Sequence, residues 1–121
     1  MDIPVIKKTK EGIEAYLLPI EEIWYVNVEN NRDVVYHTKD DKFYQPTSME
    51  QVHAILKEQG FEKLDRGVIA NIQNIQHLDT NMGKVYFEPE ISQESKYATV
   101  AFSNLRKLKK YFRQAFEKKK D

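Results

Sequence analysis

The first part of the chain alternates apolar and polar residues over short stretches, a pattern typical of half-buried β-strands. Branched and aromatic side chains, which pack well on a pleated surface, are enriched in the same stretches. Turn-forming residues such as Asn30-Asn31 separate them, so a meander of successive strands is expected. The strands predicted in this part are 4–8, 13–18, 23–28, 33–38 and 42–45.

Two later segments change to the spacing of an amphipathic helix. Thr47 and Glu50 form a capping box in front of the first segment and Gly60 ends it, which predicts a helix at 48–59. Ser103 is a suitable N-cap for the second helix, and the apolar stripe of that helix consists of Leu105, Leu108, Phe112, Ala115 and Phe116.

Further strands are predicted at 64–69, 75–79, 84–87 and 97–102. The whole pattern indicates an α+β domain that is mostly β, with a short middle helix and a C-terminal helix. A chain of 121 residues with 40% apolar residues suits one domain with one core. We place this domain at 5–116, followed by a basic C-terminal tail at 117–121.

Targeting features and cysteines are absent from the sequence. There is no cysteine, no signal-peptide pattern and no apolar run near the roughly 20 residues that a membrane-crossing helix needs. The expected location is therefore the cytoplasm.

Charge is balanced overall, with 19 basic and 19 acidic residues, but it is distributed unevenly. Residues 105–121 carry eight basic side chains and two acidic ones, which leaves eleven basic and seventeen acidic for residues 1–104. A basic end suits a polyanion approached from one side, because phosphate affinity depends on local potential. From charge alone, a Lys-rich helix face in contact with water is the simpler interpretation.

Patterns for catalysis or metal binding are missing. The sequence has no nucleophile elbow, phosphate loop or paired-His zinc motif, and His37, His53 and His77 share no ligand spacing. Residues 79–83 faintly resemble a calcium loop, but Gly83 stands where a ligand is required, so a hairpin turn is favoured. We therefore expect no enzymatic activity, no cofactor and no small-molecule substrate.

Residues 61–75 and 98–112 resemble the second half of a LytTR-type DNA-binding domain. Upstream, residues 23–27 resemble the family's "IxYIE" strand and residues 37–41 its "hT.dg" turn. The order of the motifs agrees throughout. The segment before the first motif is too short for an upstream receiver domain, so the resemblance implies a stand-alone regulator or an excised domain. The resemblance implies a strand-rich fold whose loops enter successive major grooves of double-stranded DNA, with two copies on repeated half-sites.

Several signature residues of the family are replaced. Arg66 is kept from the "HRS" trio, whereas Asp65 stands for His and Gly67 for Ser. Ala101 and Phe102 replace the "SR" pair that starts the last helix. An acidic side chain repels phosphate, although it can accept a hydrogen bond from cytosine N4. Specificity is therefore not transferred from the family to this chain.

The candidate DNA-binding residues are Asn31, Arg32, Arg66, Ser103, Asn104, Arg106, Lys107 and Lys110. Arg66 suits guanine and an Asn suits adenine, while the remaining basic residues suit the phosphate backbone. Three of these residues also suit a structural role: Asn31 is a favoured turn residue, Asn104 can extend the helix cap, and Arg66 can pair with a neighbouring acid. We interpret Asn71 as structural, bonding backbone in the turn that follows it.

Two functions remain open. One is sequence-specific regulation of transcription on double-stranded DNA. The other is a LytTR-fold interaction module, or an antagonist that pairs with a related regulatory protein and has reduced DNA binding. The acidic body and Asp65 favour the second function.

Overall fold

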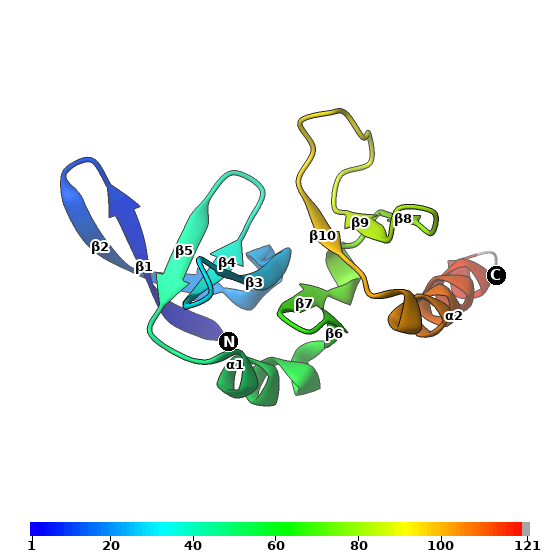
Figure 1. Ribbon diagram of the computed structural model, residues 1–121, viewed down its shortest axis with the longest axis horizontal. Helices are drawn as coiled ribbons and strands as arrows, with labels where there is room; N and C mark the ends of the chain where they lie inside the picture. Colours follow the sequence, from blue (N-terminus) through cyan, green and yellow to red (C-terminus); the bar gives the residue numbers. More distant parts are fainter. Residues whose placement is uncertain (120–121) are drawn as a thin grey trace.

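A computed structural model describes the backbone of residues 1–119 and the side chains of residues 1–112. It contains a seven-stranded antiparallel sheet, a three-stranded sheet and two α-helices (Figure 1). The larger sheet consists of β1 (Asp2–Thr9), β2 (Gly12–Pro19), β3 (Tyr25–Glu29), β4 (Asp33–His37), β5 (Lys42–Gln45), β6 (Phe61–Asp65) and β7 (Val68–Asn71). The smaller sheet consists of β8 (His77–Asp79), β9 (Lys84–Tyr86) and β10 (Tyr97–Thr99). The helices are α1 (Met49–Leu56) and α2 (Phe102–Lys119), and short 3₁₀ turns lie at η1 (Ile20–Glu22), η2 (Lys57–Gln59) and η3 (Ile72–Asn74).

The strand order of the larger sheet is β2-β1-β5-β4-β3-β7-β6. Its hairpins β1–β2, β3–β4 and β6–β7 join neighbours, as short turns between antiparallel strands require. Figure 1 shows the β1–β2 hairpin at one end of the long axis and the smaller sheet with α2 at the other end. The predicted strand-rich α+β architecture with two helices is confirmed.

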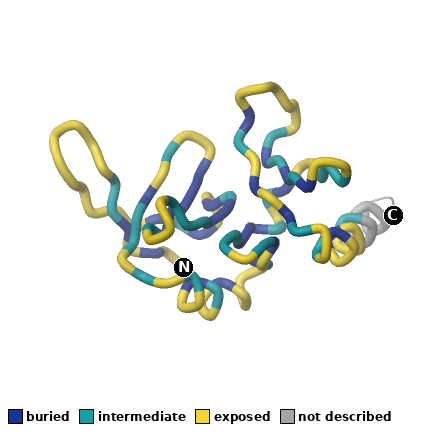
Figure 2. The backbone as a smooth tube through the Cα atoms, in the orientation of Figure 1, coloured by how far each residue is buried: buried dark blue, intermediate teal, exposed yellow. Residues whose placement is uncertain are grey.

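The larger sheet separates two hydrophobic cores. Val52 and Leu56 of α1 pack in the first core with Val26 of β3. Tyr25 lies in the second core, which also contains Leu105 of α2 and residues of the smaller sheet. Because successive side chains of a strand point to opposite faces, neighbouring residues of β3 serve different cores. Figure 2 shows buried segments along the middle strands and an exposed tip on the β1–β2 hairpin.

One predicted strand, 64–69, is wrong. The structure has β6 and β7 there, joined by a tight turn at Arg66 and Gly67. The backbone N–H of Arg66 donates to Oδ1 of Asp65 at 2.7 Å, which stabilises the turn. The register also shifts between Lys63 and Asp65. Because the turn has only two residues, the apolar residues at the end of β6 and the start of β7 lie close together in sequence. The hydrophobic pattern of 64–69 therefore resembles that of one continuous strand.

The helix caps differ from the predictions. The capping box of α1 is formed by Ser48 and Gln51 rather than by Thr47 and Glu50. The end of the helical segment at Gly60 is confirmed, with this glycine in the left-handed conformation at φ 87°.

Ser103 is not the N-cap of the C-terminal helix, because α2 already begins at Phe102. The backbone N–H groups of Val100 and Ala101 donate to the carbonyls of Gly83 and Leu64. These two bonds turn the chain out of the smaller sheet earlier than the sequence indicated. The predicted strand 97–102 accordingly ends at Thr99.

The apolar stripe predicted for α2 is found at Leu105 and Leu108, which are buried, and at Phe112, which packs beside them. Ala115 and Phe116 lie beyond the described side chains. The boundary predicted between a domain at 5–116 and a tail at 117–121 falls inside α2, and residues 120–121 lie outside the described residues. Among the described residues, neither helix has both the length and the apolar character needed to cross a bilayer.

Gly83 lies in the β8–β9 turn, and its carbonyl accepts a hydrogen bond from the backbone N–H of Val100, just before α2. Its φ is +65°, and a Cβ at this position would lie 2.9 Å from the backbone oxygen of Val100. We expect Gly83→Ala to lower the free energy of unfolding by about 1–2 kcal/mol, measured by chemical denaturation. Gly67→Ala is the matched control, because its φ is not positive and the nearest atom to a new Cβ is 4.0 Å away. Equal losses for the two variants would contradict a specific role for Gly83.

Candidate nucleic-acid interface

The turns after β3 and before β7 lie at the same end of the larger sheet. β3 and β7 are antiparallel, with Asn27 opposite Val68. The end of β3 that leads into the β3–β4 turn therefore lies beside the start of β7, which follows the β6–β7 turn. The Cγ2 of Val28 lies 4.0 Å from where a Cβ on Gly67 would be, which agrees with this register. Residues far apart in sequence thus form one surface.

The N-terminus of α2 is fixed beside the same β6–β7 turn. The carbonyl oxygen of Leu64, near the end of β6, accepts two hydrogen bonds at 2.9 Å. One comes from the backbone N–H of Ala101 and the other from the side-chain amide of Asn104. Asn104 therefore attaches α2 to β6, a structural role for its amide nitrogen. Ser103 lies exposed in the first turn between these two anchors.

One side of α2 lies along β6. Lys107 Nζ lies 3.1 Å from Oε2 of Glu62, and the hydroxyl of Tyr111 donates to Oε1 of the same carboxylate at 2.7 Å. Burial tends to raise the pKa of Glu62, but the hydrogen bonds from Tyr111 and Lys107 lower it overall. Glu62 is therefore a carboxylate that partly neutralises Lys107. This basic residue contributes less local potential than its charge alone suggests.

The outer side of α2 is basic and exposed. An α-helix turns about 100° per residue, so Phe102, Arg106 and Lys110 follow one another along one side at four-residue spacing. Lys109 is exposed close to this line. Arg106, Lys109 and Lys110 take part in no ion pair with any of the described side chains. Phe102 and Lys109 are exposed on this side of α2 but were not among the candidate residues, although the helical spacing could have indicated both.

Arg66 is exposed at the tip of the β6–β7 turn. Its neighbour Asp65 binds the backbone N–H of Arg66, and the described residues provide no ion pair for its guanidinium group. The local ion pair considered from the sequence is therefore not formed. Arg66 is therefore exposed without an ion pair among the described residues, two residues after the Leu64 carbonyl that anchors α2.

The β3–β4 turn requires residues that tolerate the left-handed conformation. Asn30 and Asn31 have φ of 54° and 58°, and the backbone N–H of Arg32 donates to the carbonyl of Glu29 at 3.2 Å. Asparagine is favoured at such positions, which accounts for the two residues structurally. The side chains of Asn31 and Arg32 remain exposed, and the hydrogen bonds of the described residues include none from either side chain. Both are therefore available to a ligand.

All three segments of this surface lie within one region of the chain that matches a known family. The sequence matches the family model described as "LytTr DNA-binding domain" over residues 14–113. The chain belongs to the LytTR family of DNA-binding domains. This family is non-enzymatic, and membership supports double-stranded DNA as the partner and a general role in transcription regulation.

A solved structure with the same fold supports this assignment. It is a LytTr DNA-binding domain of a putative methyl-accepting/DNA response regulator from Bacillus cereus. The alignment covers 92% of this chain and 94% of that chain, with a TM-score of 0.62 and 16% sequence identity. At this identity the likeness concerns the fold alone. No curated protein matches the sequence significantly.

Asn71 is a structural residue of this LytTR domain, as predicted. It is buried, its Oδ1 accepts from the backbone N–H of Gln73, and its amide nitrogen donates to the carbonyl of Ile23 at 3.2 Å. These bonds connect η3 to the segment before β3. Residues 79–83 form the predicted hairpin turn, in which Asp79 Oδ1 accepts from two backbone N–H groups.

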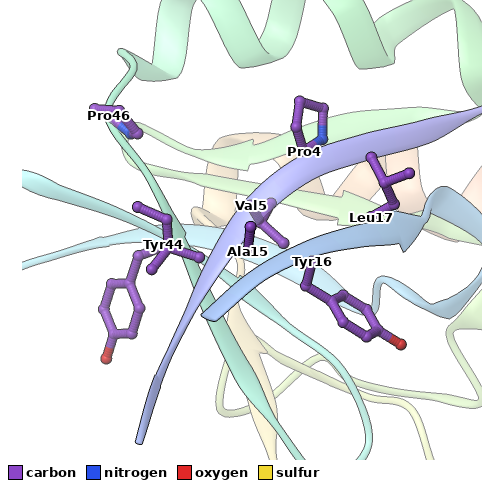
Figure 3. A pocket seen from close by; sticks show the side chains of 8 residues that line it. Pro4, Val5, Ala15, Tyr16, Leu17, Tyr44 and Pro46 are labelled. Atoms are coloured by element: carbon purple, nitrogen blue, oxygen red, sulfur yellow. The ribbon is translucent and has the colours of Figure 1, made fainter. Parts of the chain in front are cut away.

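An apolar pocket lies at the opposite end of the LytTR domain, on the β1–β2 hairpin and β5 (Figure 3). Its volume is about 380 Å³, and its lining includes Pro4, Ala15, Leu17 and Tyr44. No charged side chain is among its lining residues, which makes it unsuitable for phosphate. The described residues also contain no cluster of acidic or histidine side chains that could hold a metal ion.

Proposed function

We propose that this LytTR domain is a sequence-specific transcription regulator that reads the major groove with two turns and the N-terminus of α2. The observation that carries the proposal is the convergence of exposed polar side chains from three distant segments. They come from the β3–β4 turn, the β6–β7 turn and the start of α2. Short turns on a rigid sheet suit base recognition, because they present side chains at fixed positions.

Every candidate residue except Asn104, whose amide anchors α2 to β6, has a DNA-binding role that its geometry permits. The exposed guanidinium group of Arg66 can donate two hydrogen bonds to O6 and N7 of guanine. Asn31 can bind N6 and N7 of adenine. Arg32, Arg106 and Lys110 position the phosphate backbone, and Lys107 adds less because Glu62 neutralises it. Ser103, at the N-terminus of α2, can donate to a phosphate oxygen.

The number of copies on the DNA is proposed from the repeated half-sites that the family resemblance implies. We propose that two copies bind one regulatory site, in the cytoplasm, and that the DNA-binding domain extends over residues 5–116.

The alternative function is that of a protein-interaction module or an antagonist of a related regulator. One observation favours it: Ile13 and Leu17 of the β1–β2 hairpin are 70% and 64% exposed.

The test is selection from a random pool of double-stranded DNA with the purified protein. The enriched sequence and a scrambled one are then compared by fluorescence anisotropy at two salt concentrations. We expect a repeated motif, tighter binding to the selected site, and a loss of affinity with a log slope of about 0.9 per neutralised phosphate. Absence of enrichment would reject the proposal and favour the protein-interaction function.

A further inference from the structure

Phe102 is the most exposed large apolar side chain of the described residues, at 73%. It belongs to neither hydrophobic core. A phenyl ring left in water stabilises nothing in the isolated domain, and its burial in a complex is favourable. Its exposed position leaves the ring available for a contact with a ligand.

The backbone on both sides of Phe102 is held firmly. The N–H of Ala101 and the amide of Asn104 both bind the carbonyl of Leu64 at 2.9 Å. Leu64 precedes Arg66 by only two residues, so Phe102 starts α2 beside the turn that carries the candidate base-reading arginine. Fixed neighbours reduce the ordering cost of a contact made by Phe102.

The side of α2 that carries Phe102 also indicates the chemistry of its partner. Arg106 and Lys110 follow Phe102 along this side and suit phosphate, whereas the phenyl ring has no hydrogen-bonding group for phosphate or sugar. The apolar group that B-DNA presents in the major groove is the C5-methyl of thymine. Phe102 therefore suits contact with a thymine methyl group, while the basic residues behind it on the helix suit the neighbouring phosphates.

We propose that Phe102 contacts the C5-methyl group of a thymine in the major groove and thereby determines specificity at one base pair. This inference rests on the proposed function. It assigns an apolar contact to a surface that otherwise recognises DNA with polar and charged groups. It also predicts that the selected site contains a thymine that is required for its methyl group.

The experiment combines Phe102→Ala with replacement of each thymine of the selected site by uracil, which removes only the methyl group. In the wild-type protein, we expect one uracil position to weaken binding about 3- to 10-fold by anisotropy titration. Phe102→Ala should weaken binding to the thymine site by a similar factor. The uracil at that position should then have no further effect in the variant, because the methyl contact is already lost.

Ile13→Ala is the matched control. Ile13 is 70% exposed but lies on the β1–β2 hairpin, at the other end of the long axis (Figure 1). This variant should bind both DNAs as the wild type does. A thermal melt checks that Phe102→Ala is folded, and we expect an unchanged midpoint since Phe102 lies outside both cores.

The outcomes separate the inference from the proposed function. If the wild-type protein enriches no site, the proposed function fails and the inference fails with it. If the wild-type protein is specific but no uracil position matters, the inference alone is overturned. It is also overturned if Phe102→Ala keeps the wild-type sensitivity to uracil, or if the variant weakens scrambled and selected DNA equally.

Discussion

Arg66→Ala is expected to weaken binding to the selected DNA site by about 1–3 kcal/mol, with relaxed specificity at one base pair. Arg66 is exposed at the tip of the β6–β7 turn and has no ion pair among the described side chains. Its guanidinium group can therefore form both hydrogen bonds to guanine without breaking an existing contact. The measurement is anisotropy titration against the selected site and its single-base variants.

Two lysine variants control for the loss of a positive charge. Lys110→Ala removes a phosphate contact and should weaken all DNA sequences alike, with a smaller salt dependence. Lys57→Ala removes an exposed charge from η2, next to α1 on the opposite face of the sheet, and should leave affinity nearly unchanged. If Arg66→Ala reduces affinity for selected and scrambled DNA by the same factor, Arg66 is not a base-reading residue.

The second large effect concerns stability and is located at His37. This residue is 3% exposed on β4, where its ring stacks on Tyr25 with centroids 4.2 Å apart. Its Nε2 lies 2.7 Å from Oδ1 of Asn27, while Nδ1 has no hydrogen-bond partner among the described residues. Burial, followed by the positive charges of Lys96 and Lys42, lowers the pKa of His37 to about 3.

This lowered pKa makes stability dependent on pH. Between pH 6.5 and pH 3, the unfolded chain binds a proton at His37 that the folded chain does not bind. The unfolded state is therefore favoured as the pH falls through 6.5, and the full stability is present above that value. We expect the free energy of unfolding to fall by about 2–3 kcal/mol between pH 7 and pH 4.5 from this residue.

Urea denaturation at several pH values measures the effect. His37→Gln removes the titrating group, so its free energy of unfolding should vary less with pH in this window, whatever its absolute stability. His77→Gln is the matched control, because His77 is exposed on β8, and it should keep the wild-type dependence. A wild-type dependence in the His37→Gln variant would show that folding does not lower the pKa of His37.

Local patterns predicted the elements whose signals are confined to a few residues. Alternation in the first part predicted β1 to β5 because each strand there has a distinct turn after it, such as the left-handed Asn30 and Asn31. The helix before Gly60 was predicted because polar capping residues precede it and a left-handed glycine ends it, although the capping pair that forms is one residue later than predicted. The hairpin at Arg66 was missed because its turn depends on hydrogen bonds and a register shift that leave no strong turn residue besides Gly67.

The sequence by itself determined the strand-rich α+β class, the two helices, the family and the basic C-terminal segment, because these follow from local periodicity, motif order and composition. Only the tertiary structure decided which candidates share a surface. Strand register placed the β3–β4 and β6–β7 turns together, and the Leu64 carbonyl fixed the start of α2 beside them. It also decided that Asn104 is an anchor, that Lys107 is paired and that Phe102 is exposed, because each depends on contacts between residues distant in sequence.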